Sequence, residues 1–394
     1  MRLGFHDAAP FDVTTNTGRP NGCIDFNDPD NAGLQTVVGQ IATIQANLKN
    51  AGIKVSLADL YQYGALVATW CAVPNLPVGS TTVVPFTFKY GRKDSLSCPY
   101  TSDTGHLPDS EKSYGEIYAL VETRWGMKFW QMSALMGAHA LGNTRVVDSG
   151  YSTPFPLGNG VGKGGGGVQG SWAAKNAVLD GESFYRVMHD FIWERQSETH
   201  DGKTRHSFTS GVTGGSLTGS LGTQVLLLNT DVAILWDAGD DTTINTRTCS
   251  VKGNDGGSTV GYDAVVAGVL ASKSTECYTM VAGKCPMMSW SGNPCVITNK
   301  KDAGGSAIVD LLSLVMAYGK STSTSTKSVF QSTSTVGMDT WFPDFVSSYI
   351  QMGELGYTTL CSPGTTCNPN SLIQSAPAQT WKEQVQDSWD EWAK

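Results

Sequence analysis

Apolar residues recur every three or four positions along much of the chain, which is the period of an amphipathic helix. The pattern predicts helices over Asn31–Ala51 and Ser56–Ala72, and a third from Lys128 to Gly142, where a glycine suits a helix end. Helix-like spacing returns over Gly181–Glu194 and again over Trp341–Gly356. The first half shows no long alternating strand pattern, so the sequence predicts a mainly α fold.

A Gly-, Ser-, Thr- and Cys-rich stretch interrupts this pattern at residues 238–337. It carries one apolar run, Ile308–Met316, and the tract STSTSTKSVFQSTSTV near its end. Because such a composition leaves little to bury, we interpret the stretch as a large insertion. A glycine-rich segment, KGGGGVQG at residues 163–170, is interpreted as a loop for the same reason.

Composition and charge narrow the function classes. With 40% hydrophobic residues among 394, the chain can build one sizeable core. A net charge of −8 disfavours a nucleic-acid partner, because phosphate binding needs clustered Lys and Arg. No stretch approaches the roughly 20 consecutive apolar residues that span a bilayer, so no membrane span is predicted. Nine cysteines indicate secretion or another oxidising compartment.

Arg2 and His6 lie four residues apart and therefore share one face of a helix. A neutral imidazole beside a guanidinium suits peroxide cleavage. The imidazole takes a proton from the peroxide and returns it to the leaving oxygen, while the guanidinium stabilises the developing negative charge. Taken alone, an Arg/His pair on a helix is more often a surface feature.

His139 stands in the apolar segment LMGAHALG. One interpretation is a core histidine that donates to a backbone carbonyl. The other is an axial iron ligand, whose second ring nitrogen donates to a carboxylate. Asp231, in LLLNTDVAILWD, is the candidate carboxylate, because a charge in so apolar a setting needs a strong partner.

Several of these motifs together resemble the plant, fungal and bacterial haem peroxidase superfamily. MRLGFHDA is similar to the distal-histidine motif, LMGAHALG to the proximal-histidine motif, and LLNTDVAI to the segment of the proximal aspartate. DFNDPDNAGLQ resembles the segment whose asparagine orients the distal histidine, which corresponds to Asn31. The features mix the cytochrome c and ascorbate peroxidase class with the secreted fungal class, so the resemblance is to a hybrid type.

The resemblance implies a single helical domain over residues 1–394 that holds haem b between a distal half (1–125) and a proximal half (126–237 and 338–362). Residues 363–394 would form a C-terminal tail. In relatives another helix precedes the distal one, whereas Arg2 is here the second residue. We therefore expect the chain to be a fragment whose N-terminal helix, and any signal peptide, is missing.

The function implied by the resemblance is the reduction of hydrogen peroxide to water through a ferryl intermediate, with oxidation of an unidentified small-molecule or protein donor. The alternative is a haem-binding or adhesive module without turnover. Catalysis would use Arg2, His6, Asn31 and Asp231, and His139 would ligate the iron. The haem would contact Phe5, Leu135 and Ala138.

Two further assignments follow from the resemblance. The proximal tryptophan of the cytochrome c and ascorbate peroxidase class corresponds to Trp172 by motif or to Phe155 by counting from His139, and we prefer Trp172. A distal calcium ion would use oxygen ligands of the kind that this ion prefers, from Asp7, Asp25 and Asn27.

The cysteines also follow the secreted fungal class in part. Cys249 and Cys361 resemble a half-cystine pair of that class, so a disulfide between them is predicted. The position resembling Cys71 pairs in that class with a cysteine that would here precede Met1. Since nine cysteines leave one unpaired, Cys71 is the expected free thiol.

Overall fold

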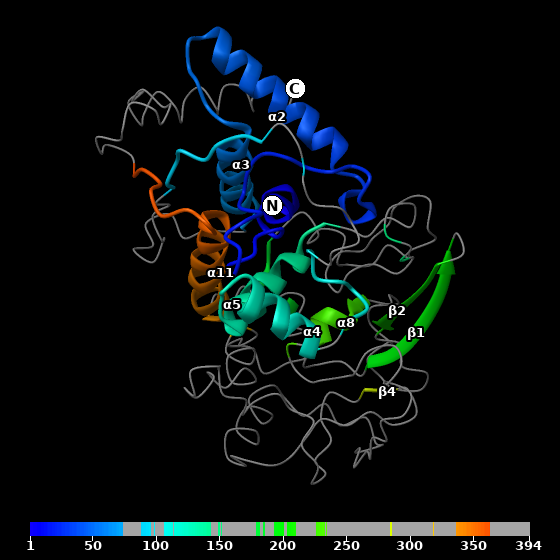
Figure 1. Ribbon diagram of the computed structural model, residues 1–394. Coiled ribbons are helices and arrows are strands. Elements are labelled where there is room, and N and C mark those ends of the chain that lie inside the picture. Colours follow the sequence, from blue (N-terminus) through cyan, green and yellow to red (C-terminus); the bar gives the residue numbers. More distant parts are fainter. Residues whose placement is uncertain are drawn as a thin grey trace. The chain divides into compact units, whose positions relative to one another are not determined.

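Figure 1 shows a computed structural model of the chain. The chain divides into two compact units. The first comprises residues 1–68, 84–106 and 350–394, and the second residues 69–83 and 107–349. The described residues are 1–73, 88–95, 98, 106–112, 114–142, 149, 151, 179–181, 184–185, 193–200, 203–209, 226–232, 234, 284–285, 318 and 336–362.

Several helices lie wholly or partly in the first unit, and all of them except α2 contribute buried residues to it. They are α1 (Arg2–Ala8), the 3₁₀ turn η1 (Pro29–Asn31), α2 (Gln35–Asn50), α3 (Leu57–Ala72) and the end of α11 (Val336–Glu354). The predicted start of α2 at Asn31 is wrong, because Gly33 adopts a φ of 83° and interrupts the helical backbone. The prediction for α3 is confirmed, and Ser56 caps it, since its Oγ accepts a hydrogen bond from the backbone N of Asp59 at 3.0 Å.

A buried ion pair joins three segments of the first unit. Arg92 Nη1 lies 2.8 Å from Asp59 Oδ1 on α3, and the two side chains are 2% and 4% exposed. Arg92 Nε also donates to the carbonyl of Gly353 on α11 at 2.8 Å. The other carboxylate oxygen of Asp59 accepts from the backbone N of Gly91 at 2.8 Å. The pair therefore fixes α3, the segment of Arg92 and the end of α11 to one another.

The second unit contains the short helices that follow one another from residue 114 to 140. They are α4 (Tyr114–Tyr118), the π-helical turn η3 (Ala119–Arg124), α5 (Phe129–Met136) and the 3₁₀ turn η4 (Gly137–Ala140). The helix predicted over Lys128–Gly142 is therefore too long. Its α-helical part ends at Met136, and His139 lies in the tighter turn that follows.

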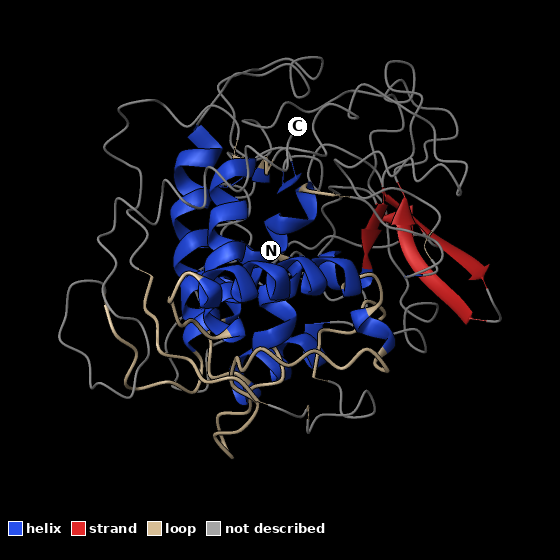
Figure 2. Ribbon diagram, turned by 90° about the horizontal axis from the view of Figure 1, so that it is seen from above, coloured by secondary structure: helices blue, strands red, loops and turns tan. Residues whose placement is uncertain are grey.

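A small antiparallel sheet, not predicted from the sequence, belongs to the same unit (Figure 2). Its strands are β1 (Trp193–His200), β2 (Lys203–Thr209), β3 (Leu226–Leu228) and β4 (Lys284–Cys285), in the order β3-β2-β1-β4. In the β1–β2 pair Glu194 lies opposite Thr209 and His200 opposite Lys203. The predicted helix over Gly181–Glu194 is thus wrong at its end, where Trp193 and Glu194 begin β1. The prediction of a mainly helical fold is confirmed.

The cysteines of the described residues differ in state. Cys23 and Cys98 form a disulfide with Cα atoms 5.4 Å apart, a pair that the sequence did not predict. Cys361 is also in a disulfide. Cys249 lies outside the described residues, so its pairing with Cys361 stays a prediction. Cys71 is a free and exposed thiol, as expected.

Other sequence predictions fall mainly on residues that the structure does not describe. These are the loop at 163–170, most of the insertion at 238–337 and the tail at 363–394. The division into distal half, proximal half and insertion stays a prediction. Within the described ranges, none of the helices has both the length and the hydropathy needed to cross a bilayer.

Replacing Arg92 with Met should lower the free energy of unfolding by roughly 3–5 kcal/mol, because the Asp59 carboxylate would stay buried without its cation. Lys89→Met is the matched control. It breaks the Lys89–Glu354 ion pair, whose side chains are 39% and 21% exposed, and should cost about 1 kcal/mol or less. Urea unfolding of both variants measures the difference, and equal losses would contradict the assignment.

Candidate active site

The first cluster of polar side chains is built on α1 and η1. Arg2 and His6 lie on one face of α1, and Arg2 Nε lies 3.3 Å from His6 Nε2. The guanidinium is held by two backbone carbonyls. Its Nη1 donates to Ala32 at 2.8 Å and its Nη2 to Asp30 at 2.6 Å. These bonds fix the cation beside the imidazole, although Arg2 itself is exposed.

Asn31 sets the tautomer of His6. Its Nδ2 donates to the carbonyl of Asp25 at 2.8 Å, so its Oδ1 is the atom that faces His6 Nδ1, at 2.8 Å. Because Oδ1 can only accept, Nδ1 of His6 carries the hydrogen. The lone pair of the imidazole then resides on Nε2, on the side of Arg2. This arrangement presents a positioned base beside a positive charge.

The environment keeps the His6 imidazole neutral. Burial lowers its pKa to about 3, and the nearby charge of Arg2 acts in the same direction, while the hydrogen bond to Asn31 opposes both. A base must be unprotonated to accept a proton, so a low pKa keeps His6 competent at neutral and mildly acidic pH.

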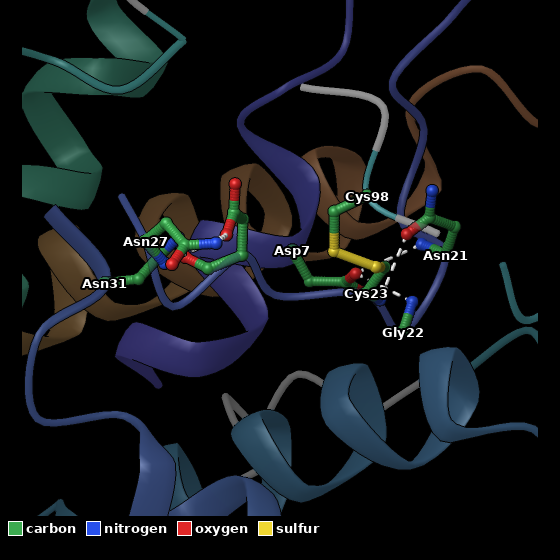
Figure 3. The surroundings of a disulfide bond; sticks show 8 residues. Asp7, Asn21, Gly22, Cys23, Asn27, Asn31 and Cys98 are labelled. Carbon is green, nitrogen blue, oxygen red and sulfur yellow. Dashed lines mark hydrogen bonds between the residues drawn. A yellow bond between two sulfur atoms is a disulfide. The ribbon is translucent and has the colours of Figure 1, made fainter. Parts of the chain in front are cut away.

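Asp7 follows His6 on α1 and anchors the next loop (Figure 3). Its buried carboxylate accepts from the backbone N of Asn21 at 3.1 Å and of Gly22 at 2.8 Å. Burial raises its pKa to about 7 despite these bonds. The disulfide of Cys23 begins at the next residue, so the carboxylate and the disulfide hold the same turn.

The residues named for a distal calcium ion have protein partners. Asp7 Oδ1 accepts the two backbone bonds just described, and Asp25 Oδ1 accepts from the backbone N and the Nδ2 of Asn27 at 2.9 and 3.0 Å. Among the described residues, no group of three or more His, Cys, Asp or Glu side chains is arranged to hold a metal ion.

The second cluster joins η4 to the turn after β3. His139 Nδ1 lies 2.6 Å from Asp231 Oδ1, and Asp231, on α8 (Asn229–Val232), is fully buried. Asp231 Oδ2 accepts from the backbone N of Leu228 at 2.8 Å. Asn229, the first residue of α8, donates to the carbonyls of Glu111 and Lys112 at 3.0 and 3.1 Å and so ties the helix to that segment. The carboxylate is thus hydrogen-bonded through both oxygens.

Asp231 also governs the charge state of His139. Burial alone lowers the pKa of His139, but the charge and hydrogen bond of Asp231 outweigh it, so the pKa is raised. With Nδ1 engaged by a carboxylate, Nε2 is the ring nitrogen that can ligate a metal, and the carboxylate makes that nitrogen more basic. The side chain of His139 is 32% exposed, which leaves room for a bound group.

The remaining predicted site residues divide in two. Leu135 is buried on α5, whereas Ala138 and Phe5 are half-buried beside His139 and His6 in sequence. Trp172 and Phe155 lie outside the described residues, so the choice between them stays a prediction. Two residues of the His139 surroundings, Tyr185 and Trp341, were not singled out from sequence, because buried aromatic residues are usually core.

Comparison with known proteins gives one family match and several relatives. The family model described as peroxidase matches residues 1–172. L-ascorbate peroxidase 3 of Arabidopsis thaliana is 31% identical over 155 residues, which are 39% of this chain and 50% of that protein. A mitochondrial cytochrome c peroxidase of Candida glabrata is 28% identical and covers 41% of this chain and 42% of its own length.

A longer match extends into the second half of the chain. A protein of Candida albicans described as a heme-binding peroxidase is 25% identical over 242 residues, which are 60% of this chain and 68% of that protein. The chain spans about half the length of the plant relatives that it matches.

Histidine titration by NMR should show that the pKa of His6 lies near 3 and rises in Arg2→Gln, where the repelling charge is removed. The linkage has a definite sign. Between pH 6.5 and about pH 3 the His6 imidazole is protonated in the unfolded chain but not in the folded one. His6 therefore makes the free energy of unfolding fall as the pH is lowered through 6.5. A His6 that titrates near 6.5 in the folded protein would contradict this electrostatic account.

Proposed function

We propose that this chain, whose residues 1–172 match the family model described as peroxidase, is an enzyme of the haem peroxidase superfamily that reduces hydrogen peroxide with bound haem b. The observation that carries the proposal is that the chain contains two histidine clusters with complementary chemistry, one in each unit. His6 is held neutral beside a guanidinium, and His139 is held against a buried carboxylate. The first suits proton transfer and the second suits iron ligation.

The residues present fit a haem group. His139 offers an imidazole nitrogen whose ring is oriented by Asp231, the arrangement that iron ligation by histidine favours. Leu135 and Ala138 precede it, and Phe5 precedes His6, so apolar side chains are available to contact a porphyrin. When bound, the haem would supply a redox-active iron and the electrons that reduce the peroxide.

The chain's own residues move the protons. His6 Nε2 would take the proton from one oxygen of the peroxide and deliver it to the other oxygen, which leaves as water. Arg2 stabilises the negative charge that develops on that leaving oxygen. Asn31 accepts from Nδ1 throughout, which keeps the imidazole in its tautomer and orientation. Two electrons from the donor, with two protons in total, balance the reduction of one peroxide to two waters.

The donor, the intermediate oxidation state and the compartment stay open predictions. The donor is a small molecule or a protein, and a screen of ascorbate, cytochrome c, phenols and Mn(II) on the haem-loaded chain identifies its class. The Cys23–Cys98 disulfide favours an oxidising compartment. A distal calcium ion and a redox role of Trp172 are retained as proposals from the resemblance.

Replacing His6 with Leu should slow the reaction with peroxide by roughly 10²-fold or more and leave haem binding intact, because only the proton transfer is removed. Stopped-flow spectra of the haem-loaded chain measure the rate, and a titration with haem measures the binding. A rate that is equally slow in the wild-type chain would favour the alternative, a haem-binding module without turnover.

Replacing His139 with Ala should abolish stable haem binding, whereas Asp231→Asn should retain haem and change the optical spectrum of the iron. Such substitutions beside a ligand typically cost about 10–100-fold in affinity or activity. Unchanged spectra in both the His139 and the Asp231 variants would refute the ligand assignment.

A further inference from the structure

The hydroxyl of Tyr185 is inserted into the backbone of α5. In a regular α-helix the carbonyl of Ser133 would accept from the backbone N of Gly137. Here the Tyr185 hydroxyl donates to the Ser133 carbonyl, with the Ala134 carbonyl 3.1 Å away. One side chain therefore stands where one helical hydrogen bond would be.

Trp341, on α11, forms a hydrogen bond with the next carbonyl of α5. Its Nε1 donates to the carbonyl of Ala134 at 2.9 Å, and the indole is fully buried. An α-helix would supply the N–H of Ala138 to that carbonyl. Two consecutive carbonyls of α5 thus receive donors from side chains far away in sequence.

The backbone changes character at this point. The N–H of Gly137 turns to Ala134, three residues back, and Leu141 bonds Ala138 in the same three-residue pattern. Helices bend or tighten where a side chain enters the hydrogen-bond ladder. The α-helix accordingly ends at Met136, and His139 follows on the 3₁₀ turn.

Glycines make room for the indole on both sides. A Cβ atom on Gly137 would lie 2.6 Å from the Trp341 ring, and one on Gly181 would also clash with it. The ring is packed further by Tyr185 and Phe345, at 6.3 and 5.0 Å between ring centroids. The place of the indole is therefore fixed by backbone as well as by side chains.

We propose that Tyr185 and Trp341 are positioning residues for His139, which end α5 by taking the carbonyls of Ser133 and Ala134 and so set where the imidazole lies. Without them the ladder would continue, and each further α-helical residue would turn the chain by about 100° about the axis instead of the wider 3₁₀ step. The inference rests on the proposed function, since it takes His139 as the iron ligand.

The test compares Tyr185→Phe and Trp341→Phe with Tyr318→Phe in the haem-loaded full chain. Tyr318 is the matched control, because its ring packs on Tyr185 at 5.0 Å while its hydroxyl bonds Asp344 at 2.8 Å, away from α5. The readouts are the iron–histidine stretching band, the reduction potential and the rate of haem loss. Tyr185→Phe and Trp341→Phe should shift the band and the potential and speed haem loss about tenfold or more, and Tyr318→Phe should not.

Amide hydrogen exchange of the haem-free chain tests the positioning role of Tyr185 separately from the proposed ligand role of His139. Tyr185→Phe should alter the protection of the Gly137 and Ala138 amides and leave those of α3 unchanged. A wild-type protein without an iron–histidine band would overturn the proposed function, and unaltered exchange at Gly137 would overturn the positioning role. Equal shifts in the Tyr185 and Tyr318 variants would also overturn it, because general packing would then suffice.

Discussion

The hydrogen bond between His139 and the buried carboxylate of Asp231 is the interaction on which the candidate site of the second unit depends. A charge with no exposed surface is costly unless its oxygens are hydrogen-bonded, and here one oxygen receives His139 and the other the backbone of Leu228. The requirement runs in both directions. The carboxylate orients the imidazole, and the imidazole makes the burial of the carboxylate tolerable. Neither residue can be exchanged without leaving the other in an unfavourable place.

Hydrogen-bonded carboxylates also occur in the first unit, where backbone amides are among their donors. Carboxylates accept two main-chain hydrogen bonds each and so hold a loop or a helix start in place. They are Asp7, which binds Asn21 and Gly22; Asp59, which binds Gly91 and Arg92; and Asp94, which binds Leu57 and Ala58. Each of these carboxylates therefore fixes a different segment of the first unit: the loop at Asn21, the segment at Gly91 and the start of α3.

Local pattern predicted the helices whose stability is local. The apolar spacing predicted α3 to within a residue, and α2 was misplaced only where Gly33 breaks the turn. The apolar pattern did not predict features that depend on residues far away in the sequence. The carbonyls at the end of α5 accept from Tyr185 and Trp341, which are 52 and 207 residues away and leave no trace in the local pattern. The hairpin was missed although Asp-Gly between β1 and β2 is a strong two-residue turn signal.

In the candidate site, too, the spacing of residues predicted local contacts but not those between distant residues. That Arg2 and His6 share a face follows from their spacing, but the partnership of His6 with Asn31, 25 residues away, came from the family resemblance. The structure adds the atoms, and with them the tautomer. For His139 the partner is 92 residues away, and the spacing of apolar residues carries no information about that contact.

These separations have a consequence for how the His139 site forms. His139 is oriented by Asp231, and its helix is ended by Tyr185 and Trp341, whose contacts span 52 and 207 residues. Contacts of such length do not persist in an unfolded chain, because closing each loop costs conformational entropy. A geometry suited to iron ligation therefore exists only once the second unit has folded. A group that binds only that geometry stabilises the fold by an amount that grows with the logarithm of its affinity, so binding of the proposed haem and folding should be measured as one linked equilibrium.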